Sequence, residues 1–174
     1  MGVTSPTPAQ TVGPFFEIGL RWLDPPELVG PAHPGAVRVA GQVFDGHGEP
    51  VPDAVIEIFQ ADPGGRFPPE TAEGWTGFAR CLSDDEGRYE FVTVKPGPVE
   101  EGAAPHLDVS VFARGLLQRL VTRCYFADEP TTATDRLLAA VGEAAASLVA
   151  ERQGDAYRFD VHLQGDRETA FFAW

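Results

Sequence analysis

The sequence predicts an all-β fold, a β-sandwich with an extended N-terminal arm and one or two short helices. Apolar side chains alternate with other residues from Val39 to Phe44 and again from Ala54 to Gln60, and an Asp-Gly-His-Gly turn at 45–48 follows the first run. A period of two is typical of strands that bury one face. The 19 Gly and 16 Pro lie between such runs, as turns do in a loop-rich β protein.

Further strands are expected along the rest of the chain. They are a pair within Arg80 to Val94 around the turn 83–87, then Leu107 to Ala113, Thr122 to Phe126, and a last strand from Tyr157 to Gly165. Strands at this spacing, with turns between them, are typical of a sandwich. The segment from Asp135 to Arg152 instead carries apolar residues at helical spacing and is interrupted by Gly142, which predicts one or two short helices.

Both ends of the chain are too apolar to be free tails. The Pro-rich residues 1–35 include six large apolar groups, namely Phe15, Phe16, Ile18, Leu20, Trp22 and Leu23. We expect this arm to pack on the core or on a partner, and the C-terminal Thr-Ala-Phe-Phe-Ala-Trp to be covered in one of the same two ways. Because 174 residues suit one domain, residues 1–174 are expected to form a single domain with the sandwich over 36–174.

Charge and composition exclude several classes of function. A net charge of −13 argues against a nucleic-acid partner, which would need clustered Lys and Arg, and it means that an anionic substrate needs a local cation. The sequence contains no apolar run near 18 residues, and the first ten residues lack the pattern of a signal peptide, so a cytoplasmic protein is expected. Cys81 and Cys124 are expected to be buried as small hydrophobic groups without chemistry of their own.

Five segments resemble a known family. They read QADPGGR at 60–66, KPGP at 95–98, TPAQTVGPFFEIGL at 7–20, APHLDVSVFARGL at 104–116 and YRFDVHLQGDRETAFF at 157–172. Together they are similar to the intradiol ring-cleaving dioxygenases, iron enzymes that split catechols between their two hydroxyls. The resemblance covers nearly the whole chain and implies a sandwich of the transthyretin- or immunoglobulin-like type.

Within this family, the chain looks like the non-iron alpha subunits of the heteromeric, protocatechuate-cleaving members. That resemblance implies a homologous beta subunit as partner, with iron(III) held by the beta subunit and a small aromatic substrate at the interface. It also implies a holoenzyme that opens the ring of 3,4-dihydroxybenzoate with O2 to give 3-carboxy-cis,cis-muconate, in the β-ketoadipate route. No activity is expected of this chain alone.

The ligand pattern supports this division of labour. Iron(III) in the family is held by two tyrosines and two histidines, because hard phenolate oxygens stabilise the ferric state. The first tyrosine would lie in the loop 67–77, which contains none, and the second is replaced by Val99. The histidine pair reads His106-Leu107-Asp108, so one ligand of four remains. We therefore expect neither a metal site nor catalytic residues in this chain.

The remaining histidine and the tyrosines have simpler interpretations. A single histidine in a strand is usually a hydrogen-bonded structural residue, which is the interpretation we favour for His106. Tyr89, Tyr125 and Tyr157 stand in strand patterns and are expected to pack in the core.

What the chain can contribute, by the same resemblance, is part of the wall of the substrate pocket. The family's Thr-x-Gly-Pro and Ala-Arg-Gly segments stand here as Thr11, Gly13, Pro14 and Arg114. Arg114 would offer a planar cation to the substrate carboxylate, and Gly13-Pro14 a stiff turn that a ring can approach closely. The alternatives are a surface salt bridge for Arg114 and simple packing of the arm for Thr11 and Pro14.

Two other functions compete with this one. His106, Asp108 and His162 have the composition of a 2-His-1-carboxylate triad, which would make the chain a self-sufficient Fe(II) oxygenase. His106 and Asp108 share one face of a strand, as such a site requires, but nothing in the sequence ties His162 to them. The non-enzymatic alternative is a transthyretin-like domain that only binds partners.

Overall fold

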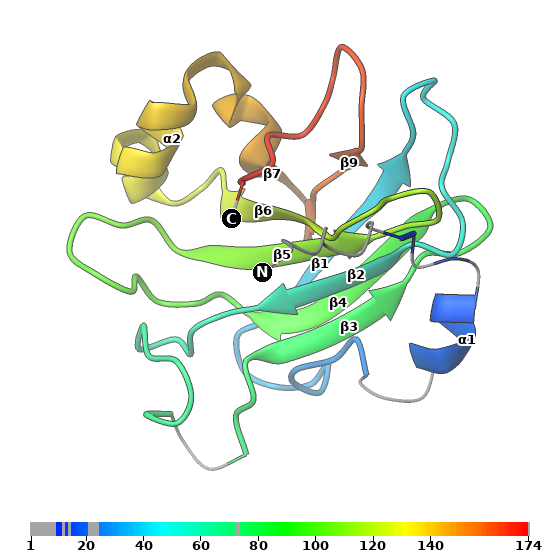
Figure 1. Cartoon of the computed structure of the whole chain (residues 1–174). Coiled ribbons are helices and arrows are strands. Elements are labelled where there is room, and N and C mark those ends of the chain that lie inside the picture. The colour runs from blue at the N-terminus through cyan, green and yellow to red at the C-terminus, as the bar shows by residue number, and fades with distance from the viewer. Residues whose placement is uncertain (1–9, 12, 14, 21–24, 72–73, 174) are drawn as a thin grey trace, which may run out of the picture.

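The computed structural model describes residues 10–11, 13, 15–20, 25–71 and 74–173 (Figure 1). The described part of the chain is mostly β, with a few short helices. Its strands are β1 (Ala36–Phe44), β2 (Val55–Phe59), β3 (Phe78–Leu82), β4 (Arg88–Val94), β5 (His106–Phe112), β6 (Leu120–Phe126), β7 (Val149–Gln153), β8 (Ala156–Arg158) and β9 (Val161–His162). Its helices are α1 (Phe15–Leu20) and α2 (Arg136–Val141), with two 3-10 helices, η1 (Pro130–Thr134) and η2 (Gly142–Leu148).

The strands form one hydrogen-bonded path. Its order is β3-β2-β5-β6-β7-β8-β1-β4, and β9 joins it by pairing with β1. Neighbours are antiparallel except for three parallel pairs, β6 with β7 and β1 with both β8 and β9. The two ends of the path, β3 and β4, lie against each other, so the sheet nearly closes on itself (Figure 1).

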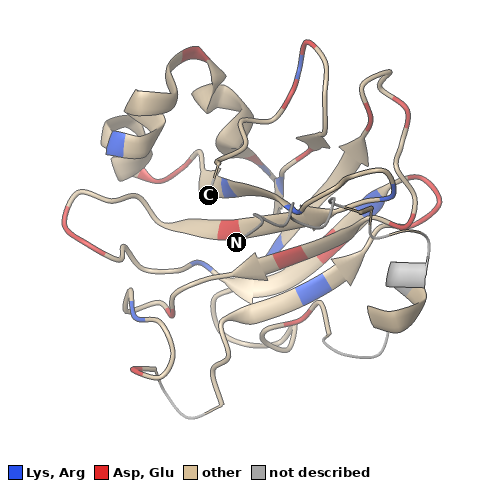
Figure 2. Ribbon diagram, viewed as in Figure 1, with Lys and Arg blue, Asp and Glu red and all other residues tan. Residues whose placement is uncertain are grey.

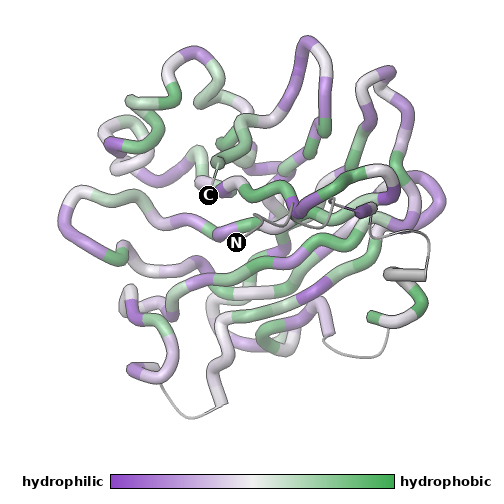
Figure 3. Tube along the Cα trace, viewed as in Figure 1, coloured by the Kyte–Doolittle hydropathy of each residue, from purple (hydrophilic) through white to green (hydrophobic). Residues whose placement is uncertain are grey.

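Alternation along the strands builds the core, as the sequence predicts. In β1 the buried residues are Val39, Gly41 and Val43, with less buried residues between them. The main apolar cluster combines alternate residues of most strands. A smaller cluster around Tyr125 and Leu148 includes the apolar residues by which α2 and η2 pack against the sheet. Figure 3 shows apolar colour interrupted by polar colour along the strands, as alternation requires, and Figure 2 shows charged residues on strands as well as on loops.

A close backbone crossing holds the last strands against β1. The Phe159 N–H donates to the Ala40 carbonyl at 2.9 Å, and the buried Tyr89 hydroxyl donates to the Phe159 carbonyl at 2.6 Å. A Cβ atom on Gly41 would lie 1.7 Å from the Phe159 oxygen. Only glycine therefore allows this approach, because any side chain would collide with backbone that cannot move aside.

The predicted single strand from Tyr157 to Gly165 is wrong, because the structure breaks it into β8 and β9. Both pieces pair with β1 in the same register, so the break is local. At the break, the Gln42 N–H donates at 2.9 Å to the Asp160 carboxylate instead of to a strand carbonyl. An acidic side chain thus replaces one bond of the ladder, which alternation alone does not reveal.

The helical prediction for 135–152 is correct up to Leu148 and wrong beyond it. Asp135 caps α2 by accepting the N–H groups of Leu137 and Leu138, and the helix ends at Gly142 as expected. The chain then turns at Val149 into β7, which lies between β6 and β8. The polar end of β7 resembles a continuing helix in sequence, but its backbone bonds go to neighbouring strands.

The two ends of the chain differ in part from expectation. The arm is not extended throughout, because α1 forms within it, on the opposite side of the molecule from α2 (Figure 1). At the other end, Phe171 packs on the main cluster, and the Phe172 N–H donates to the Val121 carbonyl at 2.8 Å. The protein itself thus partly covers these two aromatic residues, whereas Trp174 lies outside the described residues. In the described part of the chain, no helix has the length and apolar character needed to cross a membrane.

Gly41→Ala tests the crossing. The methyl group would force β1 and the Phe159 backbone apart, and we expect the free energy of unfolding to fall by more than about 3 kcal/mol. Urea unfolding followed by circular dichroism measures the change. Gly30→Ala is the matched control, because a Cβ at Gly30 meets nothing within 4 Å. Equal stability of the two variants would contradict the role given to Gly41.

Candidate functional site

The arm is fastened to the loop that carries Arg114. The Thr11 hydroxyl accepts a hydrogen bond from the Gly115 N–H at 3.0 Å and lies 3.5 Å from the Gly13 N–H. Gly13 has a φ of +69°, and a Cβ built on it meets nothing within 4 Å, so open space borders this turn. The structure therefore places Thr11 and Gly13 beside Gly115, the residue next to Arg114, although the two segments are about a hundred residues apart in sequence. Pro14 lies outside the described residues.

Arg114 follows the end of β5 and pairs with Asp53. The carboxylate of Asp53 is largely buried, with 12% of its side chain exposed, whereas the Arg114 side chain is 63% exposed. An exposed guanidinium held on one side by a fixed carboxylate keeps other N–H groups available to a second anion. Both the salt-bridge interpretation and a binding role thus agree with this geometry.

A contact between two loops fixes the position of Val99. The Asp62 carbonyl accepts the N–H groups of both Gly65 and Gly97 at 2.9 Å, and a Cβ on Gly97 would lie 2.4 Å from the Pro63 oxygen. The segments QADPGGR and KPGP therefore pack directly against each other. Val99 follows this contact and is 40% exposed at the edge of a cavity of about 220 Å³.

His106 lines the same cavity and is hydrogen-bonded, as expected of a structural residue. Its Nδ1 lies 2.8 Å from the Ala104 carbonyl oxygen, and its ring packs against Tyr125. Burial lowers the pKa of His106, and the positive charge of Arg123 lowers it further. Asp108 faces Arg123, whose Nε donates to its carboxylate at 3.0 Å.

These residues do not fit an iron(III) site. Within the described part of the chain, no group of three or more His, Cys, Asp or Glu residues could hold a metal ion. The proposed triad of His106, Asp108 and His162 is wrong, because His162 lies at a different cavity and stacks on Phe44 with ring centroids 4.8 Å apart. The self-sufficient Fe(II) oxygenase therefore has no support in the geometry.

The tyrosines are structural, as the sequence predicts. Tyr89, Tyr125 and Tyr157 are all buried. The Tyr157 hydroxyl donates to Asp128 at 2.9 Å, and burial raises the pKa values of Tyr89 and Tyr125, which keeps their phenols neutral. None of them is placed as a phenolate ligand. Cys81 and Cys124 are free thiols, and burial raises the pKa of each.

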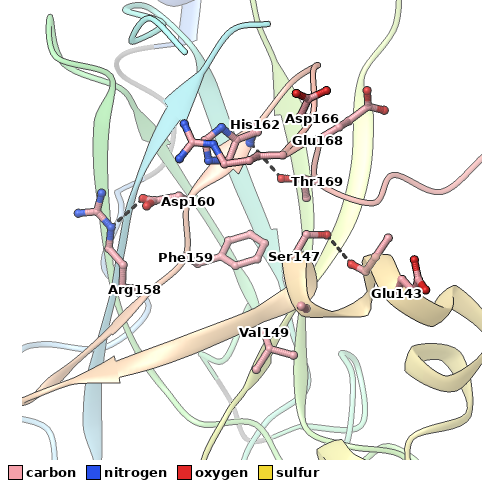
Figure 4. A pocket seen from close by; sticks show the side chains of 13 residues that line it. Glu143, Ser147, Val149, Arg158, Phe159, Asp160, His162, Asp166, Glu168 and Thr169 are labelled. Carbon is pink, nitrogen blue, oxygen red and sulfur yellow. Dashed lines mark hydrogen bonds and ion pairs between the residues drawn. The ribbon is translucent and has the colours of Figure 1, made fainter. Parts of the chain in front are cut away.

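A cavity of about 540 Å³, which the sequence does not predict, lies between η2 and the strand β9 (Figure 4). Charged residues of both signs line it. Arg158 donates to Asp160 at 2.7 Å within its wall, and burial lowers the pKa of His162. Its residues come from two neighbouring segments, 143–149 and 158–169, and the second lies within the family-like segment 157–172. The pattern of the sequence does not show that the two segments face each other across a cavity.

Comparison with known proteins shows the family. A family model described as "Dioxygenase" matches residues 29–165. The alpha chain of protocatechuate 3,4-dioxygenase from Burkholderia cepacia is 42% identical, over 95% of this chain and 96% of its own length. The chain belongs to the intradiol dioxygenases. The beta chain from the same organism is 34% identical over 74% of this chain and 64% of its own length.

A solved structure supports the family fold. The dioxygenase domain of a dioxygenase and carbohydrate-binding protein fusion from Streptomyces sp. SirexAA-E superposes with a TM-score of 0.64. It is 28% identical in sequence, and the match covers 92% of this intradiol dioxygenase chain and 99% of the other.

The buried His106 makes stability depend on pH. Its pKa in the folded protein lies below the unfolded value of about 6.5, so folding favours the neutral ring, and its contribution is lost as pH falls below that value. We expect the free energy of unfolding to decrease more steeply between pH 7 and pH 5 in the unaltered protein than in His106→Gln. Chemical denaturation at each pH measures both slopes.

His33→Gln is the control for this comparison, because His33 is exposed. Its slope should equal that of the unaltered protein. If the slope for His106→Gln also coincides with it, protonation of the His106 ring does not destabilise the fold.

Proposed function

We propose that this chain is the non-iron alpha subunit of a protocatechuate 3,4-dioxygenase. The similarity to the Burkholderia cepacia alpha chain over nearly the full length of both proteins carries the proposal. The holoenzyme would insert both atoms of O2 into 3,4-dihydroxybenzoate and release 3-carboxy-cis,cis-muconate. In this proposal residues 1–174 form one domain, and the nearly closed sheet packs as a sandwich.

The partner in this proposal is a homologous beta chain that carries iron(III). Two features of this chain support the assignment of the metal to the partner. Val99 offers no oxygen ligand, and Asp108 is already paired with Arg123. The iron of the beta chain would supply the ring-opening chemistry, while this chain would shape the pocket and build the hetero-oligomer.

The pocket wall would consist of Thr11, Gly13, Pro14 and Arg114. The Thr11 hydroxyl fastens the arm to Gly115, which keeps the Gly13 turn and Arg114 together on one surface. The open space beside Gly13 gives a flat ring room to approach. Because the side chain of Arg114 is largely exposed here, a partner that covers this surface would enclose it with the substrate.

Arg114 is the residue that would bind the substrate carboxylate. The protein as a whole repels anions, since its net charge is −13. Asp53 orients the guanidinium without neutralising all of its donors, so a substrate carboxylate can bind the remaining N–H groups. This contact would distinguish 3,4-dihydroxybenzoate from catechol, which lacks the carboxylate.

Co-expression with an iron-binding beta chain tests the subunit assignment. We expect a stable complex that contains iron and consumes protocatechuate and O2 in equal amounts, whereas this chain alone has neither iron nor activity. Size-exclusion chromatography, iron analysis and an oxygen electrode measure these properties. Stoichiometric iron and activity in the isolated chain would refute the assignment, as would a complex that does not act on protocatechuate.

Arg114→Ala tests the carboxylate contact. Loss of a charge-assisted hydrogen-bonded pair costs about 1.5–3 kcal/mol, so KM for protocatechuate should rise about tenfold to a hundredfold. KM for catechol should change little. Arg119→Ala is the matched control, because Arg119 is an exposed arginine in the same loop. Equal effects on KM for both substrates would show that Arg114 does not bind the substrate carboxylate.

A further inference from the structure

One carboxylate oxygen of Asp108 lies close to two residues, Arg123 and His106, that line the cavity beside Val99. The Oδ1 atom lies 3.0 Å from Arg123 Nε and 3.8 Å from His106 Nε2. Asp108 and Arg123 are directly opposite each other on β5 and β6, and His106 is opposite Tyr125. The four side chains therefore form a compact polar cluster whose positions are fixed by strand register.

Arg123 is the permanent cation of this cluster. Its side chain is 32% exposed, and its guanidinium also lies 3.5 Å from the Tyr125 hydroxyl. Burial opposes the charged form, but Tyr125 and Asp108 more than offset it and raise the pKa of Arg123. The guanidinium lines both the cavity of about 220 Å³ beside His106 and a second cavity of about 280 Å³ toward Phe172.

Asp135 lines the cavity beside this cluster, and its carboxylate is fully engaged. The Asp135 side chain accepts hydrogen bonds from the N–H groups of Ala104, Leu137 and Leu138, and the Tyr125 hydroxyl lies 3.4 Å away. It therefore caps α2 and does not bind cations in the cavity. Arg123 pairs directly with Asp108, and it lines the cavity beside His106 together with Arg136, Glu100 and Glu101. The Arg123 guanidinium thus brings a positive charge to the place where a bound metal would otherwise supply one.

We propose that Arg123 is an internal cation that stands in for a metal in this pocket and that its charge keeps metal ions out. A ferric ion placed beside His106 would face the guanidinium at short range, and like charges in a partly buried site repel strongly. The missing ligands alone do not close the pocket. Restoring them without removing the Arg123 charge should leave it closed to metal.

Three variants of the full-length chain separate the ligands from the charge. Val99→Tyr with Asp108→His supplies a phenol and a second imidazole next to His106 while Arg123 remains. The same pair with Arg123→Gln removes the charge, and the same pair with Arg123→Lys keeps a charge in a different shape. Each variant is incubated with ferric citrate and desalted. Iron per chain in excess of the unaltered protein and the visible absorption of a phenolate–iron(III) bond are then measured.

We expect close to one added iron per chain in the Arg123→Gln variant and less than a tenth of that in the other two. The proposal is overturned if the variant that retains Arg123 binds as much iron as the Arg123→Gln variant. It is also overturned if the folded Arg123→Gln variant binds none, because the charge would then not be what closes the pocket. If the Arg123→Lys variant binds iron while the variant that retains Arg123 does not, the shape of the side chain and not its charge closes the pocket. That result would also overturn the proposal.

A second measurement tests the internal cation without new ligands. Arg123→Gln and Asp108→Asn should each lower Tm by several degrees, because each leaves one charge of the pair unbalanced. Their combination should recover at least half of the summed loss. Strictly additive losses would mean that the two charges are not coupled, and Arg123 would then not be the cation of this pocket.

Discussion

The crossing of Phe159 over Gly41 is the constraint that the rest of the fold depends on. The hydrogen-bonded path passes from β6 through β7 and β8 to β1, so the strand ladder between the two halves of the sheet runs through the last strands. A glycine permits the approach, and the Tyr89 hydroxyl satisfies the carbonyl that the crossing buries. The crossing lies directly after the pairing of β8 with β1, so it holds in place the ladder that links the β2–β5–β6 side to the β1–β4 side over the core.

The functional surfaces depend on a second constraint, the packing of one loop against another. Asp62 binds both Gly65 and Gly97 through its carbonyl, and its carboxylate accepts N–H groups of its own loop at Gly64 and Arg66. This arrangement explains why the two turn segments that first indicated the family occur together. The same loop contact determines the position of Val99 at the edge of the cavity beside His106. By the resemblance described above, this is the position of the second iron-binding tyrosine.

Much of the fold could be predicted, because alternation and turn residues specify which residues face the core. Six strands, the helix start at Asp135 and the buried tyrosines follow from the sequence alone. The break at Asp160 and the strand at Val149 could not be predicted, since they depend on bonds to strands far away in sequence. For the candidate site, the motif predicts Arg114 and Thr11 as part of the pocket wall. The pairing of Asp108 with Arg123 depends on the register between β5 and β6, which the motif does not specify.

Arg114 and Arg123 show how the same residue type takes opposite roles in one chain. Both pair with an aspartate, and both sit in a protein of strongly negative net charge. Arg123 stands on β6 with 32% of its side chain exposed, and its guanidinium pairs with Asp108 and lies 3.5 Å from the Tyr125 hydroxyl. Under our proposal that charge excludes other cations. Arg114 stands on a loop with most of its side chain in solvent, so its charge remains available to an anion. The difference lies in burial and register, and under our two proposals it lets one arginine close a pocket to metal ions while the other recognises an anion.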